Sequence, residues 1–282
     1  MSCITNQSSN EIEIADFEFD RNPLSEGIYL ITRLIRDDFP EQQVRRELDL
    51  LVEKARSMIP ADIDEELQLE QLLHLFYHQW GFGSANGIYN LSDTMWLDKV
   101  LKTHQGAPSS LGLILIYIAE HLAIPLHPVI FPTQLLVKAD WLDGDSWVIN
   151  PLNGETLTKH MLSVWLKGHL GIHAKLNHRD LIDAANSQII LKILTALKSA
   201  LVQENKPELA LRASQLSLSL NPKDPYEIRD RGLIYAQLEC NHIAVHDLNY
   251  FIEQCPDDPV TEVIKMQLNN MDQSSIHTIT LH

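Results

Sequence analysis

Two serines stand where a run of small residues meets an apolar run, in the stretch GAPSSLGLILIYIAEHL at residues 106–122. A nucleophile at a helix N-terminus has its anion stabilised by unpaired backbone amides and by the positive end of the helix dipole, so Ser110 is a candidate nucleophile. Serine also commonly caps helices. We therefore expect Ser109 or Ser110 to cap a helix that Pro108 opens, and nucleophilic catalysis is the competing interpretation.

A serine nucleophile also requires a base within hydrogen-bond reach and a group that orients the base. The segments that follow the apolar run offer His127, Gln134 and Asn150. Glutamine and asparagine hold orientation and donate hydrogen bonds, but their amides take no proton near neutral pH. His127 precedes a proline at a strand start, and we interpret it as a structural histidine. Catalysis would therefore require His127 or His104 to lie within about 3.5 Å of the Ser110 hydroxyl.

Metal and nucleotide chemistry have little support in the sequence. His74 and His78 lie four residues apart on one helical face, but Leu75 takes the place of the glutamate found in zinc proteases, and no third ligand is near. The chain has no glycine-rich phosphate loop and no dinucleotide fingerprint. We expect no metal and no other cofactor.

The amino-acid composition indicates which classes of binding partner and which cellular compartment to expect. The 38 acidic and 22 basic residues give a net charge of −16, which would repel the phosphates of a nucleic acid. No apolar run approaches the roughly 20 residues that span a bilayer, and the N-terminus lacks the pattern of a secretory signal. Cys3, Cys240 and Cys255 have no paired spacing, which indicates reduced thiols. We expect a cytoplasmic protein that binds neither nucleic acid nor membrane.

Helical periodicity dominates the first hundred or so residues. Apolar residues recur every three or four positions, which predicts three helices before residue 80 and, after a glycine-rich break, a further helix at 91–104. The helix boundaries are expected at Pro40, at Pro60, at Ser92 or Asp93 as a cap, and at Gly106 as a stop.

Beyond residue 125 the pattern changes to short runs rich in Ile, Val and Leu, namely LHPVIFP, QLLVKADW and SWVINPL. The Asp-Gly pair in WLDGDSW is a strong hairpin signal. A helical first half followed by a small antiparallel sheet predicts an α+β domain. The segment TLTKHMLSVWLKGHLG then returns to helical periodicity with Gly168 or Gly171 as its stop, and residues 171–186 are expected to form a linker.

The C-terminal part of the chain repeats itself with a period of 34 residues. Pro-x-Asp-Pro occurs at 222–225 and again at 256–259, and Ala210 is matched by Ala244. Small residues, a tyrosine and a proline fall at the positions typical of a tetratricopeptide repeat, at Gly232, Tyr235, Ala244 and Pro256. The pattern predicts paired helices that either dock or cap the rest of the chain or bind a peptide.

These signals, taken in order, resemble the bacterial SirB-type family of invasion regulators, which joins a transglutaminase-like domain to a tetratricopeptide-repeat tail. The resemblance covers nearly the whole chain and rests on several long stretches, among them ADFEFDRNPLSEG, YHQWGFG, GAPSSLGLILIYIAEHLAIPLHPVIFPTQLLV, INPLNGE and DPYEIRDRGLIYAQL. It implies an α+β fold with a papain- or transglutaminase-like core and a helical N-terminal part, followed by an all-α tetratricopeptide-repeat tail.

The resemblance also implies a catalytic cysteine, histidine and aspartate. Matched position by position, these sites are held by Ser110, Gln134 and Asn150, and all three have departed from the catalytic types. A hydroxyl is harder to ionise than a thiol, and an amide in place of the base cannot activate it. We therefore expect a pseudoenzyme, a non-catalytic interaction or regulatory protein whose amides, tail or both bind a protein or peptide.

Two alternatives stay open. The three polar residues could simply satisfy one another and the nearby backbone, or the chain could be an amide- or ester-directed hydrolase or acyltransferase with Ser110 as nucleophile and another residue as base. The expected organisation is a flexible N-terminus at 1–22, a transglutaminase-like domain with N-terminal helices at 23–172, and a tetratricopeptide-repeat-like domain at 187–275.

Overall fold

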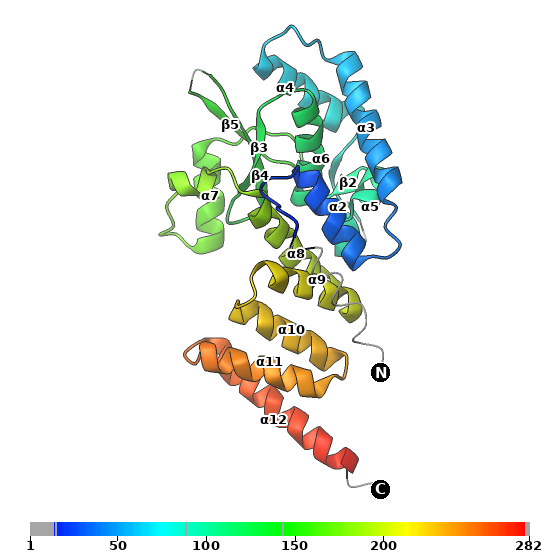
Figure 1. The fold of residues 1–282 in the computed structure, drawn as a ribbon. Coiled ribbons are helices and arrows are strands. Elements are labelled where there is room, and N and C mark those ends of the chain that lie inside the picture. Colours follow the sequence, from blue (N-terminus) through cyan, green and yellow to red (C-terminus); the bar gives the residue numbers. More distant parts are fainter. Residues whose placement is uncertain (1–13, 15, 88, 143, 280–282) are drawn as a thin grey trace. The chain divides into compact units, whose positions relative to one another are not determined.

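The computed structural model describes residues 14, 16–87, 89–142 and 144–279. The chain divides into two compact units, one formed by Phe19–Ile193 and the other by Leu194 onward together with the described residues before Phe19. The first unit combines helices with small sheets and the second is helical, as the sequence predicted (Figure 1). Within the described part of the chain, no helix has the length and apolar character needed to cross a membrane.

The structure describes three helices before residue 80, as expected. They are α2 (Leu24–Ile35), α3 (Glu41–Met58) and α4 (Glu65–His74), and α4 continues into a π-helical turn, η1 (Leu75–Gln79). The prolines stand at boundaries as predicted, because Pro40 is the N-cap of α3 and Pro60 follows the C-terminal end of that helix.

The helix expected at 91–104 is instead two pieces. Leu91–Thr94 form a 3-10 turn, η2, and Leu97–Thr103 form α5, whose N-cap is Trp96. The prediction that Ser92 or Asp93 caps this helix is therefore wrong. Ser92 is fully buried inside the 3-10 turn, where it cannot stand at the start of α5.

The predicted stop of this helix at Gly106 is also wrong. The helix ends earlier because His104 takes a left-handed conformation with a φ of 57°. Gly106 lies instead in the two-residue strand β2 (Gln105–Gly106), which pairs in parallel with β1 (Gly83–Ser84). The left-handed residue thus turns the chain from α5 toward the start of the next helix.

Helix α6 (Pro108–His121) is buried over most of its surface. The strands that follow it form an antiparallel sheet in the order β3 (Leu126–Ile130), β4 (Leu135–Asp140) and β5 (Ser146–Ile149). The β4–β5 hairpin confirms the turn signal. Of its Asp-Gly pair, Asp143 lies outside the described residues, and Gly144 has a φ of 91°, which favours glycine.

Helices α6 and α7 (Lys159–Leu170) lie on opposite faces of this sheet (Figure 1). Side chains alternate along a strand, and β4 follows that rule. Leu135 lies against Gly112 of α6, 2.8 Å from the position that a Cβ would take there. The next residue, Leu136, belongs to a hydrophobic cluster with Leu162 of α7. The strand is therefore apolar on both faces.

Residues 171–186 belong to the first unit and are not a linker, which corrects the prediction. Helix α7 ends at Gly171 with a φ of 96°, as expected, and Gly168 lies inside the helix. The segment then packs against the hydrophobic cluster on the α7 face through Ala174, Leu176 and Leu181. The apolar side chains of this segment cover one face of the sheet, whereas a linker would not pack against the domain.

Most of the N-terminus predicted at 1–22 lies outside the described residues, which omit 1–13 and 15, so that prediction stays open. Phe19 is buried. Asn186, the first residue of α8 (Asn186–Gln203), donates to the carbonyl of Phe19 at 3.3 Å and to that of Asn22 at 3.0 Å. Asp20 accepts a hydrogen bond from the Ser187 amide at 2.8 Å. These contacts hold residues 19–22 against the start of α8.

The second unit contains the paired helices predicted from the repeat. After α8 come α9 (Pro207–Leu220), α10 (Pro225–Gln237), α11 (Asn241–Gln254) and α12 (Pro259–Ile279). Gly232 of α10 lets α11 approach closely, because an added Cβ would lie 3.0 Å from Asp247 Cβ and 3.1 Å from the Leu248 side chain. Ala210 and Ala244 are fully buried. Pro256 follows the end of α11, as predicted.

A buried charge cluster also joins α8, α9 and α10. Lys198 Nζ lies 2.8 Å from both carboxylate oxygens of Glu227 and 2.7 Å from Asp230. The Ser214 hydroxyl donates to Glu227 at 2.7 Å. Lys198 and Glu227 are both buried, so loss of either would leave an uncompensated charge in the interior.

The packing at Gly232 predicts that Gly232→Val lowers the free energy of unfolding of the repeat unit by about 1–3 kcal/mol, because the new side chain collides with α11. Gly168→Val is the matched control, since nothing lies within 4 Å of the Cβ position at Gly168. Hydrogen exchange of the full chain, followed by mass spectrometry, reports the change in α10 and α11. Equal protection in both variants would contradict close packing at Gly232.

Candidate functional site

Ser110 is buried in the first turn of α6, with 1% of its surface exposed. Its hydroxyl lies 2.6 Å from the Thr94 carbonyl and 3.1 Å from the Ala107 carbonyl. A carbonyl oxygen only accepts, so the serine proton is donated to the backbone. Ser110 thereby connects η2, the segment before α6 and the helix itself.

Neither serine caps α6, which corrects the sequence prediction. Pro108 is the first helical residue, and the N-cap position falls on Ala107, which has no side chain to bond with the free amides. Ser109 and Ser110 come after the proline, one and two residues inside the helix. A proline at the first helical position therefore moved the cap to the residue before it.

Gly106 and Thr94 complete the surroundings of Ser110, and the sequence did not identify them as site residues. A Cβ at Gly106 would lie 2.6 Å from Ser110 Oγ, so only glycine leaves room for the hydroxyl. The Thr94 carbonyl accepts from the Ala107 amide at 2.9 Å as well as from Ser110. The small residues before α6 were visible in the sequence, but their contacts with η2 were not.

Gln134 and Asn150 lie together, as the matched triad positions require. Gln134 Nε2 donates to Asn150 Oδ1 at 3.1 Å, and the Leu152 amide donates to the same oxygen at 3.1 Å. The backbone of Asn150 also bonds within the loop. Its N–H donates to the Glu155 carbonyl at 2.9 Å, and its carbonyl accepts from the Gly154 N–H at 2.9 Å. Asn150, 7% exposed, therefore organises a turn directly after β5.

The close approach at Gly112 brings the elements that carry the three matched residues together. A Cβ there would lie 2.8 Å from Leu135 and 3.5 Å from Pro151. These two residues follow Gln134 and Asn150 directly in the chain, and Gly112 stands two residues after Ser110. The start of α6, the start of β4 and the loop after β5 therefore converge, as in the core that the resemblance implied.

Tyr77 is a further residue of this region that sequence reasoning missed. Its hydroxyl donates to the Pro151 carbonyl at 2.8 Å, and its ring occupies the space beside Gly154, where a Cβ would lie within 2.6 Å of two ring carbons. Burial raises the pKa of the Tyr77 hydroxyl. Tyr77 thus fixes the loop that carries Asn150. The conspicuous run YHQWGFG was the only sequence signal for it.

The two histidines proposed as possible bases have other surroundings. His127 is exposed on β3, opposite Lys138 of β4. His104 Nδ1 lies 2.6 Å from the Trp80 carbonyl, and its ring stacks on Phe82 with centroids 4.4 Å apart. Neither histidine is among the hydrogen-bond partners of Ser110, which are both backbone carbonyls.

The His74–His78 pair does not form a metal centre with other ligands. The two rings lie with centroids 5.3 Å apart and both residues are exposed. Among the described residues, no group of three or more His, Cys, Asp and Glu side chains is arranged to hold a metal ion.

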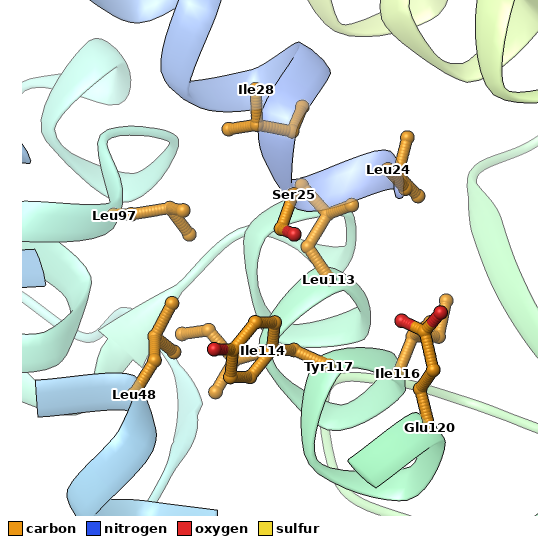
Figure 2. A pocket seen from close by; sticks show the side chains of 10 residues that line it. All are labelled: Leu24, Ser25, Ile28, Leu48, Leu97, Leu113, Ile114, Ile116, Tyr117 and Glu120. Carbon is orange, nitrogen blue, oxygen red and sulfur yellow. The ribbon is translucent and has the colours of Figure 1, made fainter. Parts of the chain in front are cut away.

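A small apolar cavity lies beside α6, away from the matched residues. Figure 2 shows it bordered by Ile28 and Ser25 of α2, Leu48 of α3, and Leu113 and Tyr117 of α6. Its volume is about 20 Å³, which is close to the space that one water requires. None of the three matched positions lines this cavity, and it has no room for a ligand.

Comparisons with known proteins agree with the resemblance seen in the sequence. Residues 42–195 match the transglutaminase-like superfamily, and residues 197–269 match the tetratricopeptide repeat. Over 263 residues, UPF0162 protein YchA of Escherichia coli K12 is 52% identical and protein SirB1 of Salmonella typhimurium is 53% identical. Each alignment covers 93% of this chain and 98% of the relative. A UPF0162 protein of Vibrio cholerae is 40% identical over 271 residues, covering 96% of this chain and all of the relative.

Proposed function

The chain belongs to the transglutaminase-like superfamily, together with SirB1 and the UPF0162 proteins, and we propose that it is a non-catalytic interaction or regulatory protein. In this proposal the transglutaminase-like core is a pseudoenzyme and the repeat tail binds a protein or peptide. The protein acts in the cytoplasm, in keeping with the free thiols of Cys240 and Cys255.

The observation that carries the proposal is the hydrogen bonding of Ser110. A serine nucleophile must give its proton to a base as it attacks. The Ser110 proton is instead directed to carbonyls that cannot take it, and the hydroxyl is almost fully buried, so a substrate has no approach to Oγ. The arrangement supports a structural role for Ser110 at the start of α6.

The amide pair supports the same conclusion. Asn150 Oδ1 already accepts two hydrogen bonds, from Gln134 and from the Leu152 amide, and these use both of its lone pairs. In a working triad the corresponding carboxylate orients a histidine. Here the two amides orient each other. Each amide still has a second polar atom, and a peptide group offers the complementary donor and acceptor.

The tail supports the protein-binding half of the proposal. Tetratricopeptide repeats stack paired helices into surfaces that bind peptides and proteins. On α10, Tyr226 is 47% exposed, and the Arg229 guanidinium lies 5.4 Å from the centre of its ring. The Arg229 side chain is only 20% exposed, so Tyr226 offers most of the accessible surface of this pair. Aromatic and arginine side chains are enriched among the residues that contribute most to protein binding.

A serine-directed fluorophosphonate probe tests the non-catalytic half. We expect the intact mass of the wild type to stay unchanged after incubation, as in Ser110→Ala and Ser109→Ala, because the Ser110 hydroxyl has no base and no access. Trypsin in the same reaction confirms that the probe is active. Labelling of the wild type and of Ser109→Ala, but not of Ser110→Ala, would replace this proposal by a serine hydrolase or acyltransferase.

The protein-binding half of the proposal predicts that Gln134→Ala and Arg229→Ala both weaken capture of a partner protein. Both should remain folded, since Asn150 keeps its bond with the Leu152 amide, and Asp230, the ion-pair partner of the 20% exposed Arg229 side chain, still pairs with Lys198. Each should retain less than about half as much of a specific partner from a bacterial cytosolic extract as the surface control Gln42→Ala, measured by quantitative mass spectrometry. Loss in one variant only assigns the binding to that domain. Equal capture by all three proteins would contradict both proposed binding surfaces.

A further inference from the structure

A groove of about 550 Å³ lies between α3 and α5 in the first unit. One wall is a single face of α3, because its lining residues Gln43, Glu47, Leu50 and Lys54 recur every three or four positions. The other wall is α5, from Asp98 to Lys102. This space, called here the α3–α5 groove, includes none of the residues Ser110, Gln134 and Asn150 and no part of the repeat tail.

The groove exposes one large apolar side chain, Leu50, that the core of the unit does not cover. Helix α3 buries Val44 and Leu48 on its core side, yet Leu50 on the groove side is 52% exposed. Leu101 of α5 and Phe82 border the same space but are only 7% and 3% exposed, so Leu50 supplies most of its accessible apolar surface. The volume falls within the roughly 300–1,000 Å³ typical of ligand sites, which combine apolar walls with a few fixed polar groups.

The charges around the groove are opposite in sign to the protein as a whole. Three exposed lysines, Lys54, Lys99 and Lys102, line it, and none has an ion-pair partner among the described residues. The acidic lining residues are Glu47 and Asp98, and Asp98 pairs with Arg36 at 2.9 Å. Arg36 also pairs at 3.0 Å with Asp38, whose charge acts on Lys99, so these four cations and three carboxylates leave an excess of one positive charge. In a chain of net charge −16, this is a local excess of positive charge.

His104 supplies a fixed polar group at the groove. The Trp80 carbonyl 2.6 Å from Nδ1 can only accept, so Nδ1 carries a hydrogen. In the neutral ring Nε2 is then an acceptor, which suits a peptide N–H rather than a carboxylate. Stacking on Phe82 and the left-handed backbone at His104 hold the ring in place. A histidine positioned in this way binds without first losing the freedom of its side chain.

We propose that the α3–α5 groove binds a short acidic peptide segment of a partner protein. Carboxylates of the segment pair with the three lysines, and a leucine-like side chain packs against the exposed Leu50. A small inorganic anion would use the lysines but not the apolar wall. A nucleic acid would meet the negative charge of the surrounding surface. The site is independent of whether Ser110 is inert.

Fluorescence anisotropy with a labelled peptide of sequence Glu-Glu-Leu-Glu-Glu-Leu-Glu tests the proposal on the full chain at low salt. We expect saturable binding that the double variant Lys54→Glu/Lys102→Glu weakens by about tenfold or more. The matched control is Lys159→Glu/Lys167→Glu, which changes the net charge equally at exposed lysines of α7 and should bind within about twofold of the wild type.

A second pair of variants, one test and one control, examines the apolar contact. Leu50→Ser should weaken the peptide severalfold, whereas Leu170→Ser, at a leucine 60% exposed on α7, should not. The proposal is overturned if the acidic peptide does not bind, if both lysine variants lose binding equally, or if a peptide with lysines in place of its glutamates binds as well. Displacement by inorganic phosphate with no effect of Leu50→Ser would assign a simple anion site instead.

Discussion

The hydrogen bond from the Ser110 hydroxyl to the Thr94 carbonyl ties the first turn of α6 to η2, and the first unit is assembled around α6. Helices α2, α3 and α5 and strands β3 and β4 all contact α6. The helix can be packed this closely because it presents glycine at position 112, where β4 and the loop after β5 approach. A serine that attacked a substrate would have to give up the bond that holds this arrangement in place. In the proposed account Ser110 therefore stabilises the fold and does not act as a nucleophile.

The same reasoning extends to the other matched positions. In the working transglutaminase-like core implied by the resemblance, a histidine and an aspartate would face the nucleophile. Here Gln134 and Asn150 bond to each other, and Asn150 also bonds to the Leu152 amide of its own loop. Tyr77 holds that loop from the other side through the Pro151 carbonyl. In the proposed account these polar groups hold the fold together, and the proposed binding surfaces are the amide pair, the α3–α5 groove and the repeat tail.

Much of this fold could be predicted from the sequence, because the signals were local and periodic. Alternating apolar runs around Asp-Gly gave the hairpin, and the period of 34 residues gave the paired helices with Gly232 and Ala244 between them. One failure, the cap of α6, was local, and the others depended on tertiary structure. A left-handed His104 ended α5, and no local rule favours histidine there over the glycine two residues on. The cap of α6 moved to Ala107 because Pro108 took the first helical position. The Lys198–Glu227 pair joins residues 29 apart, beyond any pattern within one helix.

The most direct test of the central claim is to restore the nucleophile type of the superfamily, with Ser110→Cys, and to follow alkylation of each cysteine by iodoacetamide at pH 7 by peptide mass spectrometry. An activated thiolate beside a base reacts fast even below neutral pH, whereas a buried thiol in apolar surroundings is inert. Cys240 and Cys255, both partly exposed, are the internal references. The account predicts that Cys at position 110 reacts more slowly than either reference. Faster alkylation at position 110 than at both references would mean that the centre still activates a nucleophile, and would contradict the pseudoenzyme account.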